Sequence, residues 1–146
     1  MRLFAIVFAV LMIAPIDAHS SKEHIISLTI SGYLISAEVA HTPHSRSRGL
    51  MYRKQMNENA GMLFIFPESG FHSMWMKDTY IPLSVAFIDE HGIILNIANM
   101  QPQTSIAHTS SGMAKYALEM KRGWFSARKI NTGAQVLGLN KAPPAW

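Results

Sequence analysis

Cysteine is absent from this chain of 146 residues. Its absence excludes thiol chemistry, thiolate metal sites and a disulfide scaffold, and it excludes nothing more, because an exported domain of this size folds without disulfides. Charged side chains are also few, at 15% of the residues, and the net charge is only +4. Tyr52 is the only aromatic side chain within the basic cluster of Arg46, Arg48, Arg53 and Lys54. Nucleic acid is therefore a poor partner, and peripheral attraction to an anionic envelope surface fits the charge better.

Several motifs that identify enzymes or metal sites are missing as well. The chain has no G-x-S-x-G nucleophile motif, no H-E-x-x-H zinc motif and no histidine-rich tract. It also has no internal repeat and no low-complexity segment. The sequence therefore indicates no cofactor and makes an enzyme less expected than a binding protein.

The first residues, Met1–Ala18, have the layout of a secretory signal peptide. Arg2 supplies the positive charge, Leu3–Ile13 is an unbroken apolar run, and Ala18 is a small residue suited to cleavage. We therefore expect a periplasmic or secreted protein. The alternative is an uncleaved membrane anchor, although the apolar run is shorter than the roughly 20 residues that a membrane span needs.

The rest of the chain is predicted to form one mainly β domain over residues 25–140, after a flexible leader at 19–24 and before a tail at 141–146. Short β-branched or apolar runs separated by turn residues indicate a compact β-sandwich or barrel with one or two short helices. Thr42 as cap, Pro43 at the first helical position and Gly49 at the end predict the clearest helix. The expected strands are Ile25–Ile30, Leu34–Ala40, Met62–Phe66, Ile93–Ala98, Lys115–Met120 and Ala134–Leu139.

The stretch Phe71–Asp89 is the centre of this pattern. Two strand-like runs, FHSMWM and LSVAFID, flank the segment KDTYIP. Lys77, Asp78 and Thr79 come shortly after Trp75 there, and polar groups at the end of an apolar strand are where a small β domain places a binding surface. A second segment that favours function is the long polar loop Met100–Gly112.

Three blocks together resemble the family known as domain of unknown function 192. They are Glu38–Pro43 with Arg48–Arg53, then Gly61–Pro67 with Trp75–Asp89, and finally Tyr116–Met120 with Gly123–Trp124. The resemblance runs from about Ile25 to Leu139 and implies a jelly-roll-like β-sandwich, but no activity. The chain departs from the family at Met74, which replaces a usual aromatic residue, and at Asp78, which replaces a usual asparagine. It also lacks the cysteines that some relatives carry in the long loop.

The main hypothesis is a binding or accessory module of the cell envelope that recognises a small ligand, a glycan or a peptide. A tryptophan ring provides a flat apolar surface, and neighbouring charged groups provide donors and acceptors. The alternative for each residue is a structural role in the core or in a solvated turn. The expected cleft is lined by Arg48, Trp75, Lys77, Asp78, Thr79 and Glu119.

A small acid–base hydrolase is the first rival function. Asp78 and Glu119 are its candidate catalytic carboxyls, with His108 as a further proton carrier. Glu119 lies between Leu118 and Met120, so it is either a buried acid with a shifted pKa or an exposed strand position.

Copper binding is the second rival function. His72, Met74 and Met76 alternate along the chain, and imidazole and thioether groups suit Cu(I). The alternative is that these methionines fill an irregular core and that His72 caps a strand. We therefore expect no metal site, with these three residues as the candidates if one exists.

Overall fold

The computed structural model describes residues 23–146. The predicted signal peptide Met1–Ala18 lies outside these residues, as does most of the predicted leader. None of the helices in the described part of the chain has the length and apolar character needed to cross a bilayer.

Seven strands form one curled sheet in the order β6-β5-β8-β3-β2-β1-β9. All neighbours in it are antiparallel except β2 and β3, which are parallel. A parallel pair requires a crossover connection, and here the crossover contains helix α1, Pro43–Arg48. The strands are β1 (Ile25–Ile30), β2 (Tyr33–Ala40), β3 (Ala60–Gly70), β5 (Leu83–Ile88), β6 (Ile94–Met100), β8 (Ala114–Lys121) and β9 (Val136–Leu137).

The curl brings the two ends of the sheet together at one corner. Ile94 N donates to Ala134 O and Val136 N donates to Gly92 O, so the start of β6 is bonded to the segment that leads into β9. The inner face of this half-barrel is filled by a cluster that includes Leu28, Leu63 and Leu118. Helix α2, Trp124–Ala127, adds the buried rings of Trp124 and Phe125 to that cluster.

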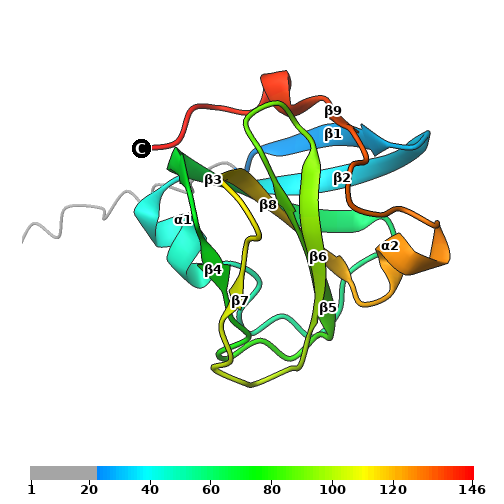
Figure 1. The fold of residues 1–146 in the computed structure, drawn as a ribbon. Coiled ribbons are helices and arrows are strands. Elements are labelled where there is room, and N and C mark those ends of the chain that lie inside the picture. Colours follow the sequence, from blue (N-terminus) through cyan, green and yellow to red (C-terminus); the bar gives the residue numbers. More distant parts are fainter. Residues whose placement is uncertain (1–22) are drawn as a thin grey trace, which may run out of the picture.

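A second layer covers part of the outer face. It consists of α1, the loop that follows it, and a two-stranded ribbon of β4 (Ser73–Met74) and β7 (His108–Thr109). Figure 1 shows α1, β4 and β7 on one side of the sheet and α2 on the other. Between this layer and the sheet lies a second apolar cluster that includes Phe64, Met76 and Phe87. Strands β3, β8 and β5 are therefore covered on both faces.

The predicted mainly β fold with short helices is confirmed, as are the cap at Thr42 and the helix end at Gly49. Four details differ from the expectation. The strand expected over Ala134–Leu139 is limited to Val136–Leu137. The run FHSMWM pairs only over Ser73–Met74, because the chain turns away at Trp75. Strand β3 extends through Pro67 to Gly70, and the loop Met100–Gly112 contributes the short strand β7.

Candidate functional site

Glu119 lies on β8, at the middle of the sheet. Its cross-strand neighbours are Met62 of β3 and Val85 of β5. It shares the outer face of the sheet with Ala117, two residues earlier in the same strand. Because that face is covered by the second layer, Glu119 is only 3% exposed. The sequence left open whether this acid is buried, and the structure shows that it is.

Burial raises the pKa of Glu119 to about 8. Desolvation is the cause, because removal from water penalises the charged carboxylate more than the neutral acid. Across residues 23–146, the Glu119 carboxyl takes part in no hydrogen bond and no ion pair. At neutral pH the side chain is therefore mainly a neutral carboxylic acid, which can both donate and accept a hydrogen bond.

The loop after α1 covers Glu119, and Gly49 allows the loop to approach the sheet closely. Gly49 has φ 49° and ψ −134°, and a Cβ atom placed there would lie 3.1 Å from the ring of Phe64. A side chain at this position would be strained and crowded at once. The next residue, Leu50, is buried in the outer cluster and anchors the loop to the sheet. Arg48 precedes this close approach and stays exposed.

A tight turn forms the opposite wall. Thr79 N donates to Met76 O over 3.2 Å, and Asp78, at the third position of this turn, has φ 51°. A β-turn of this kind requires positive φ there, which asparagine and aspartate tolerate better than most residues. The turn sends Met76 into the core, buries Thr79 and leaves Trp75 49% exposed.

These elements enclose a pocket of about 270 Å³, counting the space open to solvent. It brings together four of the six predicted site residues, Arg48, Trp75, Thr79 and Glu119. The remaining lining comes from α1, from the loop that follows it, from β3 and from β4. These residues are Arg46, Ser47, Gly49, Leu50, Met51, Phe64 and Met74.

Lys77 and Asp78, the other two predicted residues, do not line this pocket. Lys77 Nζ lies 5.6 Å from the centre of the Trp75 ring. Asp78 Oδ2 accepts a hydrogen bond of 3.2 Å from the hydroxyl of Tyr52. The Asp78 carboxylate raises the pKa of Tyr52, first through its charge and then through this hydrogen bond. Both residues thus belong to the rim around the pocket.

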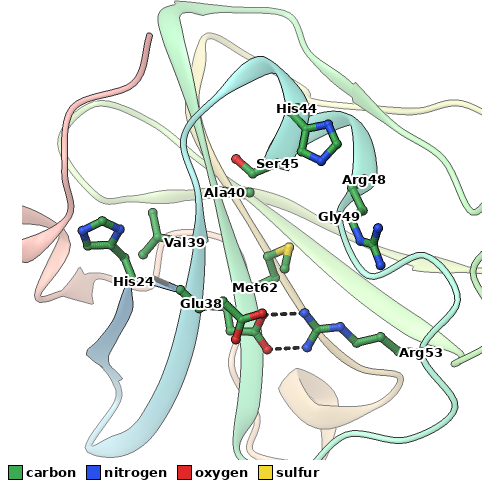
Figure 2. Close-up of a pocket in the computed structure, with 11 residues that line it drawn as sticks. His24, Glu38, Val39, Ala40, His44, Ser45, Arg48, Gly49, Arg53 and Met62 are labelled. Carbon is green, nitrogen blue, oxygen red and sulfur yellow. Dashed lines mark hydrogen bonds and ion pairs between the residues drawn. The ribbon is translucent and has the colours of Figure 1, made fainter. Parts of the chain in front are cut away.

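A neighbouring hollow lies on the other side of Arg48 and Gly49, which line both spaces. Figure 2 shows Arg53 reaching from the loop to Glu38 on β2, with Arg48 nearby on α1. Two hydrogen bonds join the pair: Arg53 Nη1 bonds Glu38 Oε1, and Arg53 Nη2 lies 2.5 Å from Glu38 Oε2. This hydrogen bonding and the Glu38 charge raise the pKa of Arg53, while burial opposes them.

The residues of the copper hypothesis occupy different environments. Met76 is fully buried in the outer cluster. The Nε2 atom of His72 lies 2.9 Å from the carbonyl of Glu68, and its ring stacks on Phe66. Met74 lines the Glu119 pocket and pairs across the ribbon with His108. In the part of the chain that the structure describes, no group of three or more His, Cys, Asp or Glu side chains is arranged to hold a metal ion.

Sequence reasoning missed two features of the site. The Glu38–Arg53 pair was not expected, because it joins residues whose contact depends on the path of the crossover. Gly49 was predicted only to end the helix, and its close contact with the sheet was not expected. An R-G-L pattern after a short helix was the available signal, since a glycine between a charged and an apolar residue favours close backbone packing.

The fold and pocket define a small mainly β domain with a polar group at the bottom of a partly enclosed pocket. The chain belongs to the family DUF192, described as "Uncharacterized ACR", which it matches over residues 26–138. This confirms the resemblance seen in the sequence.

Two solved structures are similar to the chain. One, from Sinorhizobium meliloti 1021, is provisionally named a transcription regulator. It is 34% identical, with a TM-score of 0.77, and the match covers 80% of this chain and 95% of that one. The other is a protein of unknown function from Novosphingobium aromaticivorans DSM 12444, 27% identical, with a TM-score of 0.76 and coverage of 86% and 93%. No curated protein matches the sequence.

Proposed function

We propose that the protein is a binding module for a small polar ligand, acting in the cell envelope after export. The observation that carries this proposal is the Glu119 carboxyl, which is 3% exposed and opens on the pocket without a protein partner among residues 23–146. A buried polar group without a partner is unfavourable, and a ligand that bonds to it removes the penalty.

The rest of the pocket suits a ligand with one polar and one apolar side. Trp75 presents a partly exposed ring at the wall. The Thr79 hydroxyl donates to Lys77 O, which leaves its oxygen free to accept a further bond. Arg48 supplies a guanidinium at the edge. Sugars and short peptides both combine hydroxyl or amide groups with apolar surface, so we propose these two ligand classes.

The hydrolase hypothesis keeps one point in its favour. Glu119, with its pKa raised to about 8 by burial, is protonated at neutral pH, as a general acid must be. Its proposed partner Asp78 is instead bonded to Tyr52 and lies outside the pocket lining. The binding module is therefore the better supported function.

The test is a titration of the purified protein with N-acetylglucosamine oligomers and with a set of tripeptides. Indole N–H signals in NMR spectra report binding, and a rise in the melting temperature checks it. One probe class should saturate the Trp75 signal. Trp75→Ala and Glu119→Leu should each weaken binding about tenfold or more, a loss of about 1.4 kcal/mol.

The matched control is Trp146→Ala, which removes a more exposed indole that does not line the pocket. Binding should be unchanged in this variant. If neither probe class perturbs the pocket, or if Trp75→Ala and Glu119→Leu bind as well as the original protein, the proposal is wrong.

A further inference from the structure

The hollow beside the Glu119 pocket has a different chemistry, because two guanidinium groups line it. It encloses about 490 Å³, counting the part open to solvent, and lies between α1, β2 and the start of β3. Arg48 comes from α1 and Arg53 from the loop that follows. A space of this size accommodates a small metabolite or the end of a larger ligand.

Glu38 does not make this hollow a cation site. Both of its carboxylate oxygens are bonded to Arg53, and the two side chains are only 22% and 34% exposed. A guanidinium has five N–H donors, so Arg53 retains three after bonding Glu38. The pair is neutral as a unit, and its cationic member still has N–H donors to offer to an anion.

Arg48 adds a charge that the described residues do not neutralise. Within residues 23–146 its guanidinium forms no ion pair and no side-chain hydrogen bond. Its neighbour Arg46, by contrast, donates to the carbonyls of His41 and Ile65. Helix α1 has both arginines in its last turn and no acidic residue in its first.

Other titratable groups around the hollow are one acid and two histidines. Glu23 is exposed and opposes an anion through its charge. His24 and His44 are exposed too, and each adds a positive charge when protonated. The two glutamates cancel the two arginines in formal charge, but Glu38 is engaged by Arg53 and Glu23 is exposed. The strongest free hydrogen-bond donors in the hollow are therefore the guanidinium groups, which suit an anion.

We propose that this hollow is an anion-binding site, in which a carboxylate or phosphate group of a small ligand is held between Arg48 and Arg53. Planar guanidinium groups match both anions through paired N–H donors. The two proposed sites share Arg48 and Gly49, but Arg53 and Glu38 do not line the Glu119 pocket, so variants at these two residues test this site separately from the proposed function.

The probes are inorganic phosphate and sodium acetate, added to the purified protein at constant ionic strength with chloride as the balancing anion. Backbone amide and arginine Nε–H signals are followed by NMR. Saturable shifts at Gly49 and Arg53 with either probe are expected, and the tighter probe identifies the preferred group. Loss of a charge-assisted hydrogen bond should make Arg48→Gln bind about tenfold more weakly.

Two further variants keep the test decisive. Glu38→Gln removes the competing carboxylate and should bind the anion more tightly. The double variant Glu38→Gln/Arg53→Gln leaves no unpaired buried charge, should stay folded, and should lose binding. The charge control is Arg122→Gln, an exposed arginine that does not line the hollow.

Three results overturn the proposal. They are shifts that do not saturate with either probe, unchanged affinity in Arg48→Gln, and equal weakening in Arg122→Gln. Unchanged affinity in Arg48→Gln places any binding outside this hollow, and equal weakening in Arg122→Gln assigns it to net charge.

Discussion

The buried acid Glu119 makes stability depend on pH in an unusual direction. Burial raises its pKa from the ordinary value of 4.5 to about 8 in the folded protein. Between these values the folded protein holds a proton that the unfolded chain has released. The free energy of unfolding therefore falls as the pH rises through this interval, and it stays low above pH 8.

The magnitude follows from the width of that interval. Each pH unit contributes about 1.4 kcal/mol, so the whole interval from 4.5 to about 8 amounts to roughly 5 kcal/mol. Between pH 5 and pH 8 the expected loss from Glu119 is about 3–4 kcal/mol. This is a large part of the stability of a typical small domain.

Glu119→Gln isolates this contribution. Glutamine has nearly the shape of the protonated acid but cannot ionise, so the variant should match the original protein at pH 5 and exceed its stability at pH 8. The assay is urea unfolding at both pH values, followed by tryptophan fluorescence, to which the buried Trp124 contributes. The quantity to compare is the difference in the free energy of unfolding between the variant and the original protein. The contributions of the other titrating groups cancel in this difference.

Glu68→Gln serves as the control, since Glu68 is exposed and its substitution should leave the difference near zero at both pH values. A flat difference for Glu119→Gln between pH 5 and pH 8 would refute the reasoning. It would mean that the folded protein stabilises the ionised carboxylate at this position.

Two other substitutions test the walls of the pocket. Gly49→Ala should destabilise the protein by about 1–3 kcal/mol, because it adds backbone strain and crowds Phe64. The control is Gly32→Ala, which is also at positive φ but has open space around it. This control should lower the free energy of unfolding less in the same urea assay. Asp78→Asn should keep the turn intact, since asparagine also tolerates its φ of 51°. It should lower the pKa of Tyr52 toward the ordinary value, because the Asp78 charge is the largest cause of the present increase; an unchanged Tyr52 titration, followed by NMR of the ring carbons, would contradict this.

The strands and α1 were predictable because their signals are local. Alternating or continuous apolar runs mark the strands, and the Thr42–Pro43 start fits a helix whatever surrounds it. The burial of Glu119 was not predictable in this way. Leu118 faces the inside of the half-barrel, but the outer face is buried only where α1 and the β4–β7 ribbon cover it. That cover depends on the parallel pairing of β2 with β3, a contact between segments that local sequence does not specify.

The candidate site was predicted only in part, and the reason is again that contacts depend on the path of the chain. Proximity along the chain suggested that Trp75, Lys77, Asp78 and Thr79 act together. The turn at Met76–Thr79 instead divides them, so that Thr79 lines the pocket while Lys77 and Asp78 do not. A turn reverses the chain within a few residues, and neighbours in sequence then point in different directions.

A comparison of two acids on the same face explains why Glu119 is the better candidate for function. Glu38 and Glu119 both flank Met62 across the sheet, one on β2 and one on β8. Glu38 is bonded through both oxygens to Arg53, as a structural acid should be when partly buried. Glu119 is more deeply buried and has no such partner in the described part of the chain, although Arg48 lines the same pocket. The fold thus pairs one acid and leaves the other open to a cavity, at a cost in stability that grows with pH. A group kept in that state is suited to a ligand that supplies the missing bond.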